Sequence, residues 1–528
     1  MKTDKRHDGD SLVRATSPRA PEKATSIDDE RLGQLGFESQ LDRSFSLPSL
    51  IALCLCLMGT WEGCSSVIAQ ALTSGGAPCL LYNYIFTFLC TIAIGLSLGE
   101  IASIYPTAGG EFRITDEQSR KQHPLTFTAG QYHWVTALYP VRGRKFIAWM
   151  TGWTTIGGQI VLTASIAFAC GLMTQALITM NSQSYRPTRW QALLLYWAFL
   201  FYGTTMNLWG SKLLPTANLI SGNASFVFTE VYNETGWSSD SVAWLVGLIS
   251  TVYPFLGYDA ACHLAEELPN AARNVPLAMI GSIVLNGLMG LVYAIILLFS
   301  TSKLEGVLAT PLGSPVMQIY LDATQSAAGA TTMSLLLIVL AGAACCAALT
   351  STSRTLWAFA RDEAVPYSKL IGRVDQRSQI PANAIYVILI LQMLIGFIYL
   401  GNSTAFNAVL SMAIIGTYTS YALPIVGMLL NGRRKLSVSE YGPFKLRGCV
   451  GPILNVIAVA FMVLSIAFSA LPSQIPVSWE TMNYSTGVMI GWSVFGVLYY
   501  IWKGRKQFRI PIVLTPLDGQ FPGHSGSA

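Results

Sequence analysis

Charged residues are scarce in this chain. Only 12% of its 528 residues are Asp, Glu, Lys or Arg, about half of the ~25% that is typical of soluble domains. Hydrophobic residues make up 52% of the chain, and the mean hydropathy is +0.46. This composition excludes an ordinary soluble domain and indicates a polytopic protein of the lipid bilayer.

The formal net charge of +5 does not predict a nucleic-acid partner. The Lys and Arg residues stand in short loops between apolar runs and do not form one patch. Basic residues in that pattern are typical of signals that set membrane topology.

The chain also lacks the parts of common enzymes. It has no Gly-rich phosphate loop and no His or Cys cluster with metal-ligand spacing. Most of its ten cysteines lie in or beside apolar runs, where small buried thiols are more typical than disulfides. We therefore expect no enzymatic activity, no cofactor and no metal.

The first 44 residues are polar and contain no apolar segment of the kind found in a signal peptide. We expect residues 1–44 to be a disordered cytoplasmic tail, residues 45–508 to be a transmembrane transporter domain, and residues 509–528 to be a second cytoplasmic tail.

Eleven apolar runs have the length of about 20 residues that a membrane-spanning helix needs. They lie at 47–72, 81–104, 146–178, 190–210, 241–265, 276–300, 331–358, 382–400, 405–430, 451–471 and 486–502.

The basic clusters test the order of these spans, because cytoplasmic loops are rich in Lys and Arg. Clusters follow the second, seventh, ninth and last runs. With a cytoplasmic amino terminus, all four are cytoplasmic only if the chain crosses the membrane once more between Gly210 and Ser241. No 20-residue apolar run lies there.

Asn-x-Ser/Thr triplets support the same topology. Asn233 and Asn483 fall in external loops if the extra crossing exists, and we predict glycosylation at these two residues and at Asn223. Asn402 is expected to lie too close to the membrane to be modified.

Two apolar runs are interrupted near the middle of the membrane. Residues 253–259, YPFLGYD, bring a Pro, a Gly and a carboxylate into the fifth run, and residues 59–66, GTWEGCSS, bring small and polar residues into the first. Unpaired backbone groups are costly in hydrocarbon, so such breaks are tolerated where they line a cavity. Discontinuous helices of this kind are typical of substrate sites in secondary transporters.

Several strings resemble a known family. They are LSLGEIASIYPTAGG (96–110), YHWV (132–135), VYPFLGYDAACHLAEELPNAARNVPLAM (252–279), SRTLWAFARDEAVP (353–366) and MNYSTGVMIGWSVFGVLYYIWKGRKQF (482–508). On these the chain is similar to the fungal amino acid/choline transporter family, which includes permeases for choline and 4-aminobutyrate, of the amino acid–polyamine–organocation superfamily. The resemblance implies an all-α polytopic fold of twelve helices. Ten of them form a LeuT-like five-plus-five inverted repeat, with helices 1 and 6 unwound.

The chain departs from that family in two places. The apolar fifth helix is missing after Gly222, and a polar insert at 111–127 splits the family's continuous TAGGQYHW string. The insert is either a retained intron or a genuine cytoplasmic loop. The missing helix predicts that the chain as written is not a competent carrier.

The two breaks supply the candidate substrate-binding residues. They are Trp61, Glu62, Gly63, Cys64, Ser65, Tyr253, Phe255, Gly257 and Asp259. Glu62 could meet a substrate ammonium or carry a coupling proton, and the alternative is a structural pair with a neighbouring helix. Aromatic faces of Trp61, Tyr253 and Phe255 could enclose an ammonium group, although packing is the commoner role of such rings. The amino end of an unwound half-helix could hold a substrate carboxylate.

Four residues are candidates for gating or proton transfer. Asp259, His263 and Glu267 are spaced four residues apart, which predicts one helical face, and Glu100 ends the second run. A structural hydrogen-bond ladder is the alternative for the first three. For Glu100 the alternatives are a pair with a basic loop residue and simple packing.

We expect a secondary active transporter that moves a small amine, such as an amino acid, 4-aminobutyrate or choline, by proton symport and alternating access. A nutrient sensor with the same pocket, a metabolite exporter and an inactive mis-spliced form are the alternatives. We expect the plasma membrane, with the vacuolar membrane as the alternative, and both termini in the cytoplasm.

Overall fold

The computed structural model describes residues 46–105, 130–140, 142–182, 184–209, 227–265, 268–301, 304–374, 380–401, 405–436, 441–478 and 482–508. The two expected tails, the insert at 111–127, Asn223, Asn402 and Glu267 lie outside these ranges.

Helices cover all eleven predicted spans. The longer ones are α2 (Leu47–Met58), α3 (Thr60–Ile104), α6 (Arg144–Asn181), α7 (Arg189–Trp209), α12 (Ala271–Phe299), α15 (Ala327–Arg361), α17 (Ala382–Gly396), α19 (Ala405–Gly427), α21 (Val450–Ser469) and α22 (Ser485–Tyr499). The fifth span is divided into α9 (Asp240–Val246), α10 (Ile249–Val252), the 3₁₀ turn η1 (Tyr253–Phe255) and α11 (Ala260–His263). Eight stretches are long and apolar enough to cross a membrane by length and composition. The all-α polytopic class is confirmed.

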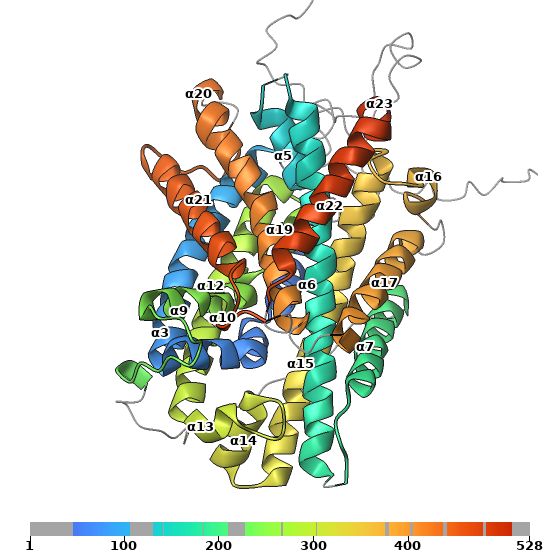
Figure 1. Cartoon of the computed structure of the whole chain (residues 1–528). Coiled ribbons are helices and arrows are strands. Elements are labelled where there is room, and N and C mark those ends of the chain that lie inside the picture. The colour runs from blue at the N-terminus through green and yellow to red at the C-terminus, as the bar shows by residue number, and fades with distance from the viewer. Residues whose placement is uncertain are drawn as a thin grey trace, which may run out of the picture.

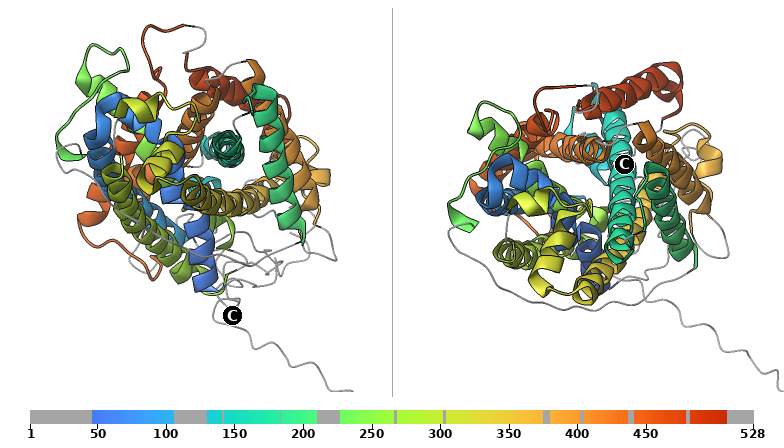
Figure 2. Two further views of the ribbon diagram at one scale, coloured as in Figure 1. Left: turned by 90° about the horizontal axis from the view of Figure 1, so that it is seen from below. Right: turned by 60° about the horizontal axis from the view of Figure 1, so that its bottom comes forward.

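The helices form one bundle around α6, which Figure 2 shows end-on near the centre. Short helices mark the two ends. One end carries α5 (Gln131–Leu138), α16 (Ser368–Ile371), α20 (Arg433–Lys435) and α23 (Arg505–Gln507), and the other carries α13 (Leu304–Leu308) and α14 (Pro315–Thr324) (Figure 1).

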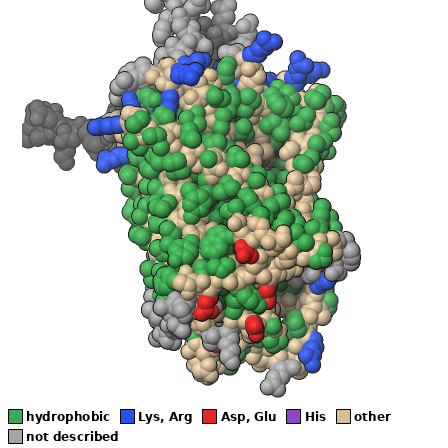
Figure 3. Space-filling view, turned by 60° about the vertical axis from the view of Figure 1, so that its left-hand side comes forward, with side chains coloured by type: hydrophobic (Ala, Val, Ile, Leu, Met, Phe, Trp, Pro, Cys, Tyr) green, Lys and Arg blue, Asp and Glu red, His purple; other side chains and the backbone are tan. Residues whose placement is uncertain are grey.

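We call the end with α5 the basic end and the end with α14 the far end. The basic clusters beside α5, α16, α20 and α23 share the basic end, as the topology with one extra crossing between Gly210 and Ser241 predicts. Lys and Arg side chains gather there in Figure 3, whereas Asp and Glu are seen lower on that face.

The first span is broken at a single residue. Gly59 takes a left-handed conformation with φ 43°, and α3 resumes at Thr60. The expectation of an unwound segment over 59–66 is therefore wrong in extent. Glycine adopts this conformation without the steric cost of a Cβ, so one residue is enough to redirect the helix.

The fifth span is broken over a longer stretch. Pro254 removes a backbone donor and lies within η1, after which Leu256 is extended and Gly257 has φ 103°. Regular helix returns only in the short α11, so the predicted interruption at 253–259 is confirmed.

Helices α6 and α7 run in opposite directions through the bundle. Helix α6 begins at the basic end, and α7 therefore runs back from the far end toward the basic end (Figure 1). Val227 packs at the far end with Val307 and Val316, beside α13 and α14. Helix α7 ends beside the middle of α15, where the side-chain amide of Asn207 donates to the Cys346 carbonyl at 2.8 Å.

Candidate functional site

Glu62 lies in the first turn of α3, directly after the break at Gly59. Its side chain is 9% exposed. Its Oε2 has no hydrogen-bond partner among the described residues and lies close to Gly59. The amino end of α3 favours the ionised form of the carboxylate. A buried carboxylate with a free oxygen in turn attracts a positive charge.

A cavity of about 30 Å³ lies in front of this carboxylate. It is lined by Leu57, Met58, Gly59, Glu62, Gly63, Ser66, Leu162, Ile166, Ala169, Met173, Tyr253, Leu256, Ala341 and Ala344. These residues come from both broken spans and from α6 and α15. A volume of this size holds one or two water-sized groups, so a primary ammonium group fits it, whereas a trimethylammonium group requires the surrounding side chains to move apart.

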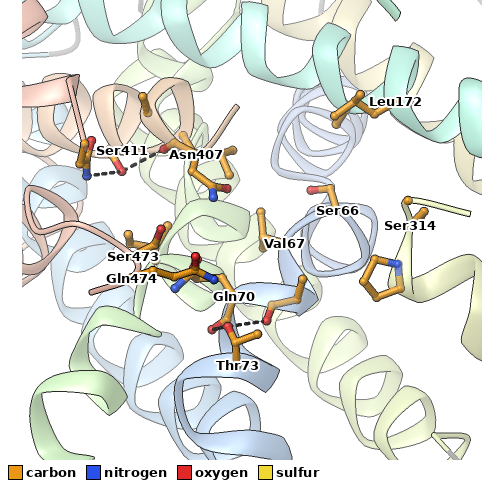
Figure 4. Close-up of a pocket in the computed structure, with 18 of the residues that line it drawn as sticks. Ser66, Val67, Gln70, Thr73, Leu172, Ser314, Asn407, Ser411, Ser473 and Gln474 are labelled. Carbon is orange, nitrogen blue, oxygen red and sulfur yellow. Dashed lines mark hydrogen bonds between the residues drawn. The ribbon is translucent and has the colours of Figure 1, made fainter. Parts of the chain in front are cut away.

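The cavity adjoins a larger vestibule at the far end. The vestibule has a volume of about 340 Å³ and shares Ser66, Ala169 and Met173 with the smaller cavity. Figure 4 shows Gln70, Asn407 and Gln474 around it. No Lys, Arg, His, Asp or Glu is among the described residues that line the vestibule. Glu62 is thus the one charged side chain described along both chambers.

The three predicted aromatic rings are not brought together. Tyr253 lines the small cavity, and its hydroxyl group is 2.8 Å from Ser165 Oγ. Phe255 is fully buried against Tyr84 and Phe88 instead. In a 3₁₀ turn of three residues per turn, positions 253 and 255 point in different directions, so both rings cannot face one cavity.

Trp61 is also absent from the described lining of both chambers. Its ring packs edge-on against Tyr293 with a centroid distance of 5.5 Å. The aromatic cage expected from the sequence is therefore wrong for Phe255 and Trp61, whose rings pack against neighbouring helices.

The other two small residues of this segment have different surroundings. Cys64 is buried and lines neither chamber, whereas Ser65 lines the vestibule. Ser65 Oγ lies 2.6 Å from the hydroxyl of Tyr293, which is 2.6 Å from the hydroxyl of Tyr320 on α14. This chain of hydroxyl groups joins the first span to the far-end helix, and neither tyrosine was predicted from the sequence.

Gly257 permits the close approach of the two breaks. A Cβ built on it would lie 2.8 Å from Leu57 Cγ, at the end of α2. Together with its φ of 103°, this leaves no room for another residue type.

Asp259 and His263 lie apart from the Glu62 cavity, among buried polar side chains. His263 Nε2 is 3.0 Å from Asp259 Oδ2, so the predicted contact at a spacing of four residues is present. The same Oδ2 accepts hydrogen bonds from Gln131 of α5 at 3.0 Å and Gln159 of α6 at 3.2 Å. Neither glutamine was predicted from the sequence to contact Asp259, although Gln159 stands out as an amide within an apolar run.

Glu100 is fully buried and forms an ion pair with Arg433, which is 13% exposed. Glu100 Oε1 also accepts a hydrogen bond from the backbone N–H of Leu446 at 2.9 Å. The pair joins the end of α3 to the first residue of α20, so the expected pairing with a basic residue is found. Among the described residues, no group of three or more His, Cys, Asp or Glu could hold a metal ion.

Two predicted sequons can be located. Asn233 is half-buried at the far end, and its amide donates to Asp240 Oδ1 at 2.9 Å. The Asn483 amide donates to the carbonyls of Ser469 and Leu471 at 2.8 and 2.9 Å, beside the vestibule. A glycan on either amide would have to replace such bonds, and glycosylation of both residues stays a prediction.

Comparison with known proteins agrees with this geometry. The model of the amino acid permease family matches residues 45–495. The chain is 29% identical to a choline transporter of Saccharomyces cerevisiae, over 89% of this chain and 83% of that protein. It is 27% identical to the amino-acid permease BAT1 of Arabidopsis thaliana, over 91% and 96%, and 24% identical to amino-acid permease 2 of Neurospora crassa, over 93% and 91%. With nearly its whole span of helices matched, the chain belongs to the amino acid permease family of membrane transporters.

Proposed function

We propose that this protein is a secondary transporter for a small organic amine, which binds with its ammonium group at Glu62. The observation that supports this most strongly is a buried carboxylate with an unpartnered oxygen, facing a cavity that adjoins an uncharged vestibule. A cationic group that enters the vestibule meets no positively charged side chain among the described residues that line it.

We further propose that the preferred amine lacks a carboxylate. An amino acid would need a donor for its own carboxylate, and the amino terminus of α3 is the natural place for it. Glu62 already occupies that position and would repel a second anion. A choline-like substrate avoids this repulsion, and a relative bearing the name choline transporter supports the same class. An amino acid or 4-aminobutyrate is the competing candidate.

The orientation follows from the charges. We propose that the basic end faces the cytoplasm and the far end faces outward, because Lys and Arg concentrate in cytoplasmic loops. The vestibule then opens outward, and substrate would leave through the basic end. Proton symport is the proposed driving mode, at the plasma membrane or, alternatively, the vacuolar membrane.

Binding and uptake should be measured separately on purified protein. We expect labelled choline to bind more tightly than 4-aminobutyrate or alanine, and to compete with them for one site. In proteoliposomes an inward proton gradient should drive its accumulation. Tighter binding of the zwitterions than of choline would overturn the proposed substrate class, and binding of none of these amines would overturn the proposed site.

A further inference from the structure

The buried cluster around Asp259 joins several helices at the basic end. Asp259 and His263 belong to α11 and its preceding turn, and they are 2% and 3% exposed. Gln131 comes from α5 and Gln159 from α6. Thr355 of α15 donates a hydrogen bond to Gln159 Oε1 at 2.9 Å, which turns the amide nitrogen of Gln159 toward Asp259. Any opening of the basic end that moves α11 away from α6 must break this cluster.

Three atoms of the cluster form a triangle that neither tautomer of His263 satisfies while Asp259 is ionised. Gln159 Nε2 lies 2.7 Å from His263 Nε2 and 3.2 Å from Asp259 Oδ2, and the last two atoms are 3.0 Å apart. An amide nitrogen only donates, a carboxylate only accepts, and a neutral imidazole has one nitrogen of each kind.

Each tautomer of neutral His263 leaves one side of the triangle unfavourable. With the proton on Nε2, His263 donates to Asp259 but faces the Gln159 amide donor to donor. With the proton on Nδ1, Nε2 accepts from Gln159 but faces the Asp259 carboxylate acceptor to acceptor. The cluster is therefore sensitive to the number and position of its protons.

A further proton destabilises the closed arrangement. Protonated His263 would carry a second N–H at Nδ1, which has no hydrogen-bond partner among the described residues. The amino end of α5 covers it, since a Cβ built on Gly130 would lie 3.1 Å from Nδ1. A buried donor without an acceptor is costly, and opening toward water removes that cost. Protonation of Asp259 instead would weaken its acceptance from both glutamines.

We propose that Asp259, His263 and Gln159 form the proton-binding site whose occupation releases the closed basic end. The inference rests on the proposed function, because it takes the basic end as the cytoplasmic gate. It assigns the coupling proton to this cluster and leaves Glu62 for the substrate.

Other titratable groups near the pair do not account for a response near neutral pH. The neighbours on its own segment, α2 and α19 are Tyr258, Cys262, Cys54 and Tyr421. Phenols and thiols ordinarily titrate above histidine. On α5, burial lowers the pKa of His133 to about 4, so it stays neutral above that pH.

Native thiols provide a test that needs no substrate. Cys54 and Cys262 are buried beside the cluster, and Cys449 is exposed at the basic end. Labelling with a maleimide, resolved by peptide mass spectrometry, gives the reactivity of the first two relative to Cys449. The ratio cancels the intrinsic effect of pH on thiol chemistry.

We expect this ratio to rise roughly fivefold or more between about pH 7.5 and about pH 5.5, which bracket the ordinary pKa of histidine. His263→Gln should abolish the rise. Asp259→Asn, which imitates a protonated carboxyl group, should give a high ratio at both pH values. The matched control His133→Gln should respond like the wild type.

A ratio that does not change with pH in the wild type would overturn the proposal, as would a normal rise in His263→Gln. Should His263→Gln fail to fold, a low ratio in Asp259→Asn at both pH values would overturn it equally. Glu62→Gln separates the two proposals: it should lose amine binding and keep the labelling response. A labelling response without any amine binding would reject the proposed function, and it would still support the proposed proton-sensitive gate.

Discussion

Glu62 is the residue on which the proposed recognition of an amine depends most directly. If its carboxylate attracts the quaternary ammonium group, which has no N–H to donate, Glu62→Gln should weaken choline binding by about 1–4 kcal/mol, the Coulomb energy of two unit charges about 4 Å apart between bulk water and a protein surface. Equilibrium binding of labelled choline measures this loss. Gln70→Ala is a suitable control, because it changes the vestibule without changing charge.

The same variant also separates two roles for Glu62. If Glu62 carries the coupling proton, Glu62→Gln should keep substrate exchange and lose pH-driven accumulation. Unchanged affinity together with unchanged accumulation would assign the residue to structure alone.

Gly257 sets the geometry of the second break. Gly257→Leu should abolish amine binding and uptake, because its Cβ would collide with Leu57 and its backbone has a positive φ. Membrane insertion should stay normal. Gly491→Leu is the matched control, since a Cβ there meets nothing within 4 Å on an exposed face of α22. Normal binding by Gly257→Leu would count heavily against the site.

For single residues, the sequence predicted those features that depend on the residue type and its neighbours along the chain. A carboxylate in an apolar run marked Glu62, and a spacing of four residues marked Asp259 and His263. It did not predict Gln131 or Gln159, because their contacts with Asp259 join residues more than 90 positions apart. Phe255 was assigned wrongly because the direction of its ring depends on the turn that Pro254 imposes.

The elements themselves were predicted with few errors, since about 20 consecutive apolar residues are a strong signal for a spanning helix. The error lay in the first break, where one glycine suffices and α3 continues through Glu62 and Ser65. Sequence alone shows which residues permit a break. It does not show how many of them use that freedom, because packing against other helices decides it.

The ion pair of Glu100 and Arg433 holds helix ends together at the basic end. Arg433→Met would leave the Glu100 carboxylate buried without its cation, which typically costs ~3–5 kcal/mol. We expect a clear fall in the thermal midpoint of the detergent-purified protein. Arg434→Met removes the same charge from an exposed neighbour and should have little effect.

The double variant Glu100→Gln with Arg433→Met should recover part of the lost stability, because the uncompensated charge is gone. Equal melting of the Arg433 and Arg434 variants would show that the pair contributes nothing. In that case Glu100 would not help to hold the helix ends together at the basic end.

For the whole molecule, the direction of the helices poses the hardest question. Helix α7 runs toward the basic end and ends beside the middle of α15, whereas Val227 packs at the far end. The seventeen residues from 210 to 226 would, as a helix, span only about 26 Å at 1.5 Å per residue, less than the ~30 Å of the hydrocarbon core. The segment also contains Lys212, Pro215 and Asn218, which are costly or disruptive in a spanning helix.

The last prediction is therefore that the chain as written binds its amine but does not accumulate it. Binding needs the two breaks together with α6 and α15, whereas alternating access needs a complete amino-terminal repeat. Sequencing the transcript is the direct test, and we expect a message that encodes an apolar helix after Gly222 and lacks the insert at 111–127. The protein from that message should accumulate choline where the present chain does not. If the message matches this chain and the expressed protein still drives accumulation, the prediction is wrong, and residues 210–226 complete the crossing without a full apolar helix.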